Sequence, residues 1–235
     1  MVIPTFNEEH NIKNTLEDVV GYFRSTHQNF DITVVDDGST DQTVSLVTHL
    51  REQFAELKIL QNKINHGKGY VIRQGMNAAT GDLVLFMDAD NATNIRELTH
   101  FTPYIQQGYD IVIGSRRIDS SGVHIDQPLQ RRILGSIYIA CTRAILGLPK
   151  MDYNCGFKLF KRTAVPLIFP KIRQHDWSYD VEIFLIAQIN HLKIKEVPVN
   201  WKHGGGSKVH PLRDGIKSFT SLLLIKFNEI RGLYS

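Results

Sequence analysis

The chain has few cysteines, little net charge and no long apolar run. Its two cysteines, Cys141 and Cys155, are too few for a disulfide framework and lack the spacing of metal ligands, which fits a reducing, cytoplasmic setting. A net charge of +3 gives no support to nucleic-acid binding. The longest uncharged apolar stretch near the middle, Ile133 to Thr142, is too short for a bilayer, which needs about 20 residues. We therefore expect neither a transmembrane helix nor a signal peptide.

Short apolar runs alternate with amphipathic segments along the first half of the chain. The apolar runs predict strands at Val2–Ile3, Ile32–Val35, Leu57–Leu60, Leu83–Met87 and Ile111–Ile113. Between them we predict helices after Asn7 as N-cap, after a capping box of Ser39 with Gln42, from Gly67, and near Ile95 to Gln107. This alternation predicts an α/β fold with a mostly parallel central sheet flanked by helices on both faces.

The second half, from about Asp119, is less regular. A helix is predicted from Gln130 to Leu146, a further segment runs from Trp177 to Ile189, and a strand-like run covers Ile194 to Trp201. A glycine-rich loop and an amphipathic stretch follow. No repeat or linker divides the sequence, so we expect residues 1–235 to form a single domain.

Two carboxylates, Asp88 and Asp90, follow the apolar run that ends at Met87. Side chains alternate along a strand, so both would point to the same side if the extended geometry persists there. Paired carboxylates are costly to desolvate without a cation, and a hard divalent ion such as Mg²⁺ or Mn²⁺ can bind them and share its other positions with phosphate oxygens. Taken alone, the pattern also fits an acidic loop after a strand.

Polar residues follow four of the predicted strands. They are Pro4 to Glu8, Asp36 with Asp37, Asp88 to Asp90, and Gly114 to Arg116. In a parallel sheet the carboxyl ends of the strands share one edge, and ligands bind beyond them where the strand order reverses. We therefore expect the ligand site at this edge.

Three of these motifs together resemble the family-2 glycosyltransferases, which have a GT-A (Rossmann-like) fold: Val2-Ile3-Pro4-Thr5-Phe6-Asn7-Glu8-Glu9, Val34-Val35-Asp36-Asp37-Gly38-Ser39 and Asp88-Ala89-Asp90. The resemblance implies that the nucleotide is bound by Pro4, Phe6, Glu8, Asp36 and Asp37, and that Asp88 and Asp90 hold the metal and the diphosphate. Lys68, between two glycines at a helix start, is positioned to meet phosphate, although a solvated lysine in a turn is as good an interpretation. Asp37 could instead form an Asx-turn or cap a helix, and Phe6 could be a packing residue.

The second half narrows the resemblance to the polyprenyl-phosphate sugar synthases, and among them to the dolichyl-phosphate β-glucosyltransferases. The blocks that carry it are Gly114-Ser115-Arg116, Gln130-Arg131-Arg132, Cys155-Gly156-Phe157-Lys158-Leu159-Phe160, Trp177 to Glu182, and Asn200-Trp201 with Ser207-Lys208. It implies inverting transfer of glucose from UDP-glucose to dolichyl (polyprenyl) phosphate, with residues 1–118 binding the nucleotide and 119–210 the acceptor. The eukaryotic enzymes carry an N-terminal membrane helix that has no counterpart here.

Cations and carboxylates in these blocks are the candidates for the chemistry. We expect Arg116, Arg131, Lys202, Ser207 and Lys208 to bind the acceptor phosphate, and Arg116 also to stabilise charge during transfer. Asp180 is the candidate base if a hydroxyl is the acceptor; on a helix Asp180 and Glu182 project in different directions, so at most one reaches the reaction centre. GDP-mannose as donor and a hydroxyl as acceptor remain the alternatives.

The C-terminal stretch, residues 211–235, is amphipathic and basic. Its apolar residues recur at helical spacing and positive charges accompany them: Ile216, Phe219, Leu223, Phe227, Ile230 and Tyr234, with Arg213, Lys217, Lys226 and Arg231. Such a helix can lie in a headgroup layer, which predicts peripheral association with the cytoplasmic face of a membrane. Packing on its own domain or on a second subunit is the competing interpretation.

Overall fold

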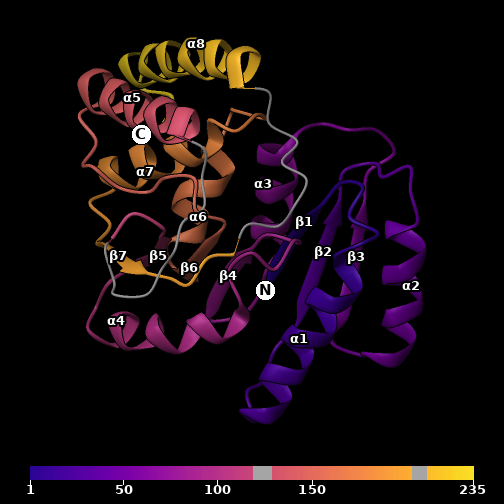
Figure 1. Cartoon of the computed structure of the whole chain (residues 1–235). Coiled ribbons are helices and arrows are strands. Elements are labelled where there is room, and N and C mark those ends of the chain that lie inside the picture. The colour runs from indigo at the N-terminus through magenta and orange to yellow at the C-terminus, as the bar shows by residue number, and fades with distance from the viewer. Residues whose placement is uncertain (119–128, 203–210) are drawn as a thin grey trace.

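The computed structural model describes residues 1–118, 129–202 and 211–235, with backbone alone at 129–133 and 211–216. One seven-stranded sheet forms its centre (Figure 1). From edge to edge its strands are β3 (Leu57–Gln61), β2 (Ile32–Asp36), β1 (Val2–Thr5), β4 (Leu83–Met87), β6 (Phe157–Lys161), β5 (Ile111–Ser115) and β7 (Ile194–Pro198). Only β6 runs antiparallel to its neighbours, β4 and β5. The predicted mostly parallel α/β sheet is therefore confirmed.

Helices cover both faces of this sheet. In chain order they are α1 (Ile12–Ser25), α2 (Thr43–Gln53), α3 (Lys68–Ala78), the 3₁₀ helix η1 (Ile95–His100), α4 (Thr102–Gln106), α5 (Leu129–Leu146), α6 (Val165–Ile168), the 3₁₀ helix η2 (Phe169–Lys171), α7 (Tyr179–Ile189) and α8 (Pro211–Ile230). Among the residues described, no helix is both long enough and apolar enough to cross a membrane.

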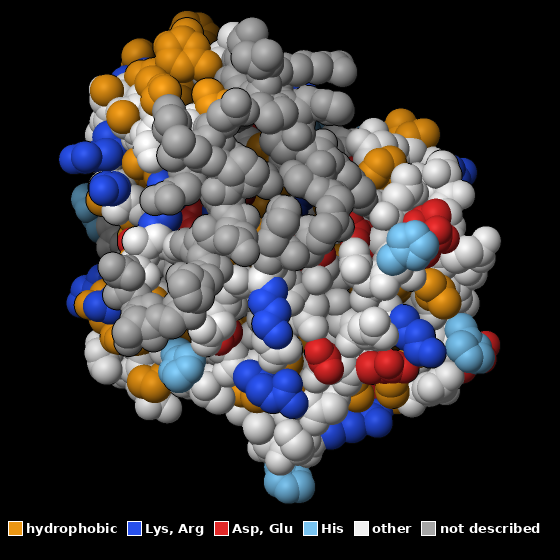
Figure 2. Space-filling view, viewed as in Figure 1, with side chains coloured by type: hydrophobic (Ala, Val, Ile, Leu, Met, Phe, Trp, Pro, Cys, Tyr) orange, Lys and Arg blue, Asp and Glu red, His pale blue; other side chains and the backbone are white. Residues whose placement is uncertain are grey.

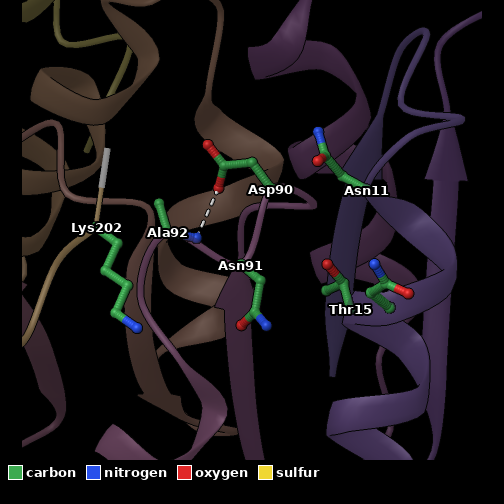
Figure 3. Close-up of a pocket in the computed structure, with 7 residues that line it drawn as sticks. Asn11, Thr15, Asp90, Asn91, Ala92 and Lys202 are labelled. Atoms are coloured by element: carbon green, nitrogen blue, oxygen red, sulfur yellow. Dashed lines mark hydrogen bonds between the residues drawn. The ribbon is translucent and has the colours of Figure 1, made fainter. Parts of the chain in front are cut away.

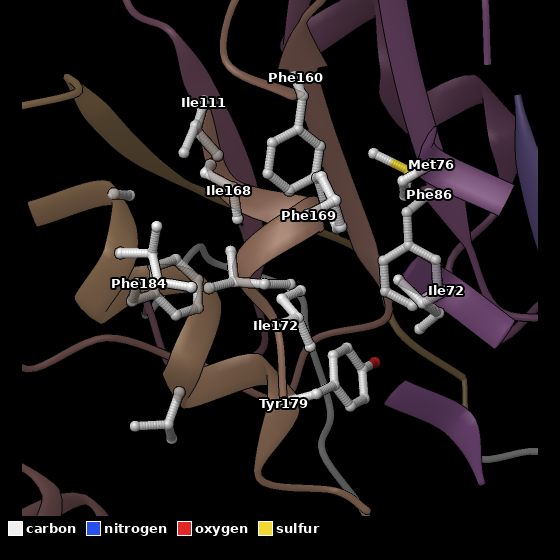
Figure 4. Close-up of a cluster of buried hydrophobic side chains, with 14 of the residues drawn as sticks. Ile72, Met76, Phe86, Ile111, Phe160, Ile168, Phe169, Ile172, Tyr179 and Phe184 are labelled. Atoms are coloured by element: carbon white, nitrogen blue, oxygen red, sulfur yellow. The ribbon is translucent and has the colours of Figure 1, made fainter. Parts of the chain in front are cut away.

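Alternate residues of the central strands serve two separate cores. In β1, Val2 packs with α3 and α7 in one core, whereas its neighbour Ile3 packs with α1 and α2 in the other. Figure 4 shows the first core, where aromatic side chains such as Phe86 and Phe160 fill the space between the sheet and its helices. This period of two is what a strand buried on both faces requires.

The strand order reverses between β1 and β4, because the chain runs from β1 outward through β2 to β3 and then returns to the other side of β1. The carboxyl ends of β1, β2, β4 and β5 all lie at the same edge, since these strands are parallel to one another. The edge predicted from the sequence is thus the one that the topology makes available for a ligand.

Several local predictions were wrong. Asn7 does not cap α1, which begins at Ile12 after Asn11; Asn7 has a φ of 54° and its side chain accepts a hydrogen bond from the Thr40 amide. The capping box is absent, because the Ser39 hydroxyl donates to the buried carboxylate of Asp36 instead, and a charged acceptor makes the stronger hydrogen bond.

Two further predicted elements differ from the structure by more than two residues. The helix expected near 95–107 is split into η1 and α4, and the last strand ends at Pro198, with Trp201 forming only an isolated bridge to Thr93.

Candidate active site

Asp36 organises the loop after β2 and is fully buried. Its carboxylate accepts hydrogen bonds from the Gly38 and Ser39 amides at 3.1 and 3.0 Å and from the Ser39 hydroxyl at 2.5 Å. These contacts form the Asx-turn that the sequence offered for Asp37. Asp36 therefore shapes the edge of the site, and its bonds to this loop account for its burial.

Asp37 ties the end of β2 to the start of α3. Its two carboxylate oxygens accept the amides of His66 and Gly67, both at 2.8 Å, and its side chain is buried. Pro4 is buried within β1 opposite Val35, so it builds the floor of this edge. The predicted nucleotide residues Phe6 and Glu8 are half-buried just beyond the strand.

Lys68 and Asp88 form an ion pair at the centre of the edge. The Lys68 Nζ lies 2.7 Å from Asp88 Oδ1, and it also lies 5.0 Å from the centre of the Trp177 ring. Burial disfavours the charged form of Lys68, but the neighbouring carboxylates, Asp88 first, raise its pKa overall. A cation thus stands beside the first carboxylate of the Asp88-Ala89-Asp90 motif.

Gly156 makes room for the Asp88 side chain. A Cβ at Gly156 would lie 1.9 Å from Asp88 Oδ2, and the Gly156 carbonyl accepts the Asp88 amide at 3.0 Å. Sequence reasoning missed this residue as part of the site. No local signal marked it, because the strand that follows Gly156, β6, was not predicted and Asp88 lies far away in the sequence.

Asp90 opens onto a pocket of about 280 Å³ (Figure 3). The strand ends at Met87, so the extended geometry assumed for the two carboxylates does not persist, and Asp90 accepts the Ala92 amide at 3.1 Å. Burial, followed by repulsion from Asp88, raises the pKa of Asp90. Residues from α1, the Asp90 turn and the segment after β7 line the pocket: Asn11, Asn14, Thr15, Asp90, Asn91, Ala92 and Lys202.

Lys202 reaches this pocket because the segment after β7 lies along the Asp90 turn. The Lys202 amide donates to the Ala92 carbonyl at 2.8 Å, and Trp201 pairs with Thr93. An exposed cation thereby lies on the same pocket as Asp90, as Figure 3 shows. Of the residues predicted to bind the acceptor phosphate, Ser207 and Lys208 with their neighbours, and the side chain of Arg131, lie outside the described residues.

The two carboxylates fit a hard divalent cation. Within the described ranges no three His, Cys, Asp or Glu side chains cluster as a complete metal site. Asp88 and Asp90 would therefore hold such a cation only together with oxygens from elsewhere, which is how Mg²⁺ commonly binds, through one or two carboxylates and substrate phosphates. Their mutual repulsion is the cost that such a cation removes.

Arg116 is engaged with a buried partner. Its guanidinium binds Asp152 through two hydrogen bonds of 2.8 and 2.7 Å, and its backbone amide donates to the same carboxylate. Burial disfavours the charged form of Asp152, but these bonds from Arg116 hold its pKa below the ordinary value. The structure thus gives Arg116 a fixed place at the end of β5, with its charge balanced by Asp152.

Asp180 is sealed beneath the site. Its carboxylate lies 2.6 Å from the Nζ of Lys158, a fully buried lysine that also donates to the Cys155 carbonyl. Burial raises the pKa of Asp180, while the charges of Lys158 and Lys68 oppose that rise. Glu182 points elsewhere, to the amides of Arg173 and Gln174, as expected for two side chains on one helix.

Comparison with known proteins shows the family of this chain. The model of the family "Glycosyl transferase family 2" matches residues 1–169. This chain belongs to glycosyl transferase family 2. The glycosyltransferase is 30% identical over 248 residues to the dolichyl-phosphate beta-glucosyltransferase of Dictyostelium discoideum, covering all of this chain and 75% of that protein. Against the human protein of the same name it is 28% identical, covering all of this chain and 76% of the relative.

Solved structures share the fold of this glycosyltransferase. Glucosyl-3-phosphoglycerate synthase from Mycobacterium tuberculosis, in complex with Mn²⁺ and UDP-glucose, aligns with a TM-score of 0.69 at 17% identity, covering 96% of this chain and 77% of that one. Mannosyl-3-phosphoglycerate synthase from Rubrobacter xylanophilus aligns with a TM-score of 0.67 at 18% identity, covering 98% and 73%. At this identity the likeness establishes the GT-A fold.

Proposed function

We propose that this glycosyltransferase moves glucose from UDP-glucose to a polyprenyl phosphate of the dolichyl type and inverts the anomeric centre. The donor sugar and the lipid acceptor are supported by the relatives, several of which are named dolichyl-phosphate beta-glucosyltransferases. A single in-line displacement on an α-linked donor gives a β-linked product. Residues 1–118 would bind the nucleotide and residues 119–210 the acceptor.

The state of Asp180 favours a phosphate acceptor over a hydroxyl. A hydroxyl must lose its proton to a base, and Asp180, the candidate for that role, is buried and paired with Lys158. A phosphate monoester, whose second pKa is about 6, is already an anion and needs placement more than deprotonation. The burial of Asp180 and its ion pair with Lys158 are the observation that supports a phosphate acceptor.

The donor side would be built from the groups around Asp88. Asp88 and Asp90 would hold Mg²⁺ or Mn²⁺, which when bound supplies Lewis-acid stabilisation of the leaving diphosphate. Lys68 contributes a positive charge beside Asp88, at the start of a helix where amides also face anions. Asp37 would help to bind the base or ribose, because it joins the end of β2 to the start of α3 and so shapes this part of the site. Lys202 would meet the acceptor phosphate from the pocket side.

Product analysis tests this function. The protein is incubated with Mn²⁺, radiolabelled UDP-glucose and a short polyprenyl phosphate, and the organic phase is analysed for a glucosyl lipid. We expect label in the lipid with UDP-glucose, and none with GDP-mannose. Transfer from GDP-mannose alone would replace the donor, whereas transfer only to a free sugar hydroxyl would refute the phosphate acceptor.

The outer face of α8 would place the enzyme on a lipid surface. Phe219, Leu223, Phe227 and Ile230 are exposed, as the amphipathic pattern requires, and Figure 2 shows hydrophobic side chains gathered where α8 lies in Figure 1. The prediction for Tyr234 was wrong, because it is buried in the core. Ile216 has no described side chain.

Cations accompany this face, which favours the headgroup layer of the cytoplasmic side of a membrane. Lys217, Lys226 and Arg231 lie on or just beyond α8. Leu223→Glu should reduce co-sedimentation with vesicles that contain anionic lipid. The control is Ile64→Glu, which changes an exposed apolar residue outside α8 and should not reduce it. Equal binding of both variants would refute the membrane role of α8.

A further inference from the structure

The segment of residues 173–178, hereafter the connecting segment, lies directly against the start of α3. The Gly69 amide donates to the His175 carbonyl at 2.9 Å. A Cβ at Gly67 would lie 2.4 Å from the His175 carbonyl oxygen, and one at Gly69 would lie 2.2 Å from that of Gln174. Backbone therefore rests on backbone on both sides of Lys68, and the Tyr179 Cβ, 2.8 Å from the same position at Gly69, fills the space further.

Glu182 holds the connecting segment from the other side. Its side chain is fully buried on α7, and its Oε2 accepts the amides of Arg173 and Gln174, both at 2.8 Å. Its Oε1 accepts the hydroxyl of Tyr234 at 2.5 Å. Three donors thus converge on this one carboxylate, and Tyr234 comes from the end of the chain just beyond α8.

A second contact joins α8 to the same segment. The hydroxyl of Ser221, on α8, donates to Asp176 Oδ2 at 3.0 Å, and the other oxygen of Asp176 accepts the Ser178 amide at 2.9 Å. The connecting segment is therefore clamped at Glu182 and at Asp176, and it also carries Trp177, whose ring lies 5.0 Å from the Lys68 Nζ.

We propose that Glu182 is a positioning residue for donor binding: together with Tyr234 it fixes the connecting segment, and the segment fixes Lys68 beside Asp88. This inference rests on the proposed function, since it takes Lys68 to contact the donor diphosphate. It assigns Glu182 no contact with substrate. The carboxylate acts through two backbone amides, the backbone contacts at Gly67 and Gly69, and the Lys68 side chain between them.

Tyr234→Phe tests the first link, because it removes the hydroxyl that donates to Glu182 and keeps the ring in the core. Isothermal titration with UDP in the presence of Mn²⁺ should show binding about three- to tenfold weaker, the usual effect of one lost hydrogen bond. Tyr153→Phe is the matched control. It removes a hydroxyl from the same core that donates to the Pro149 carbonyl, and it should leave UDP affinity unchanged.

The second link is tested in a Lys68→Met background. If the hydroxyl of Tyr234 acts through Lys68, Tyr234→Phe should add no further loss of UDP affinity there, because the two changes lie on one path. Glu182→Gln keeps an oxygen for the two amides and should bind UDP nearly as the native protein does, whereas Glu182→Ala should not.

The outcomes separate the inference from the proposed function. Native protein that binds no UDP with Mn²⁺ would refute the function and the inference together. If the native protein binds UDP, three results would each overturn the positioning role alone. They are an unchanged UDP affinity in Tyr234→Phe, an equal loss of affinity in Tyr153→Phe, and a loss from Tyr234→Phe that persists in the Lys68→Met background.

Discussion

Replacing Gly156 by alanine should disable the proposed metal site while leaving the fold intact. The added Cβ would lie 1.9 Å from Asp88 Oδ2, whereas ordinary van der Waals contact begins at 3.4 Å. The carboxylate must therefore retreat by about 1.5 Å, since the atom it meets is fixed to the backbone. Gly156 does not have a positive φ, so alanine meets no backbone strain of its own.

A displacement of the Asp88 carboxylate by this distance should weaken both metal binding and transfer. A misplacement of about 1 Å can cost about 100-fold in rate, and disturbing the support of a metal ligand costs about 10- to 100-fold in metal affinity. We expect Gly156→Ala to weaken Mn²⁺-dependent UDP binding by about 10- to 100-fold and transfer by about 100-fold. Overpacking should lower the free energy of unfolding by only about 1–3 kcal/mol.

Titration calorimetry, transfer assays and denaturant unfolding measure these three quantities. Gly21→Ala is the control, because nothing lies within 4 Å of a Cβ at that exposed position of α1. In an Asp88→Ala background, Gly156→Ala should have no further effect on UDP affinity. Native affinity in Gly156→Ala, or a loss that persists without the Asp88 carboxylate, would refute the reasoning.

Three further predictions concern charges and thiols in the same region. Lys158→Met should lower the free energy of unfolding by about 3–5 kcal/mol, because it strands the buried carboxylate of Asp180, and adding Asp180→Asn should restore part of it in urea titrations. Asp90→Asn should weaken Mn²⁺-dependent UDP binding at least about tenfold. The raised pKa of Asp90 means that its charged form is less favourable in the folded state than in the unfolded state. The variant should therefore unfold at pH 7 at a temperature no lower than that of the native protein. Burial raises the pKa of Cys155 to about 12, so an aromatic disulfide reagent at pH 8 should titrate only Cys141 in the native protein and both thiols in denaturant; fast modification of two thiols in the native state would contradict this.

The sequence was sufficient for the parallel strands of the sheet and for the edge at which the candidate site residues lie. Apolar runs such as Leu83–Met87 are long enough to need burial on both faces, and their polar ends mark the carboxyl edge whatever the strand order is. The antiparallel β6 was not recognised as a strand, because its short sequence FKLFK neither alternates nor is wholly apolar, although Lys158 within it is buried. A buried lysine is interpretable only once Asp180, 22 residues away, is seen to pair with it.

The local cap predictions failed for a related reason. Ser39 and Gln42 have the spacing of a capping box, but the Ser39 hydroxyl is taken by Asp36, and the first turn of α2 is bonded by Asp41 instead. The capping-box rule considers only the spacing between two residues, and it does not take into account a stronger hydrogen-bond acceptor such as Asp36 in the preceding turn. Likewise the fit between Gly156 and Asp88 joins residues far apart in the sequence, so no local pattern contains it.

Six aspartates at this edge of the sheet divide into two groups by their contacts. Asp36 and Asp37 accept amides from neighbouring loops, Asp152 binds Arg116, and Asp180 binds Lys158, so these carboxylates hold the frame of the site. Asp88 and Asp90 differ, because Asp88 is partly exposed beside Lys68 and Asp90 faces a pocket. Asp180, the candidate base, belongs to the first group, so its use as a base would break a buried contact with Lys158. A reaction between a nucleoside diphosphate sugar and a phosphate needs only cations together with Asp88 and Asp90. It therefore leaves the contacts of the buried carboxylates intact.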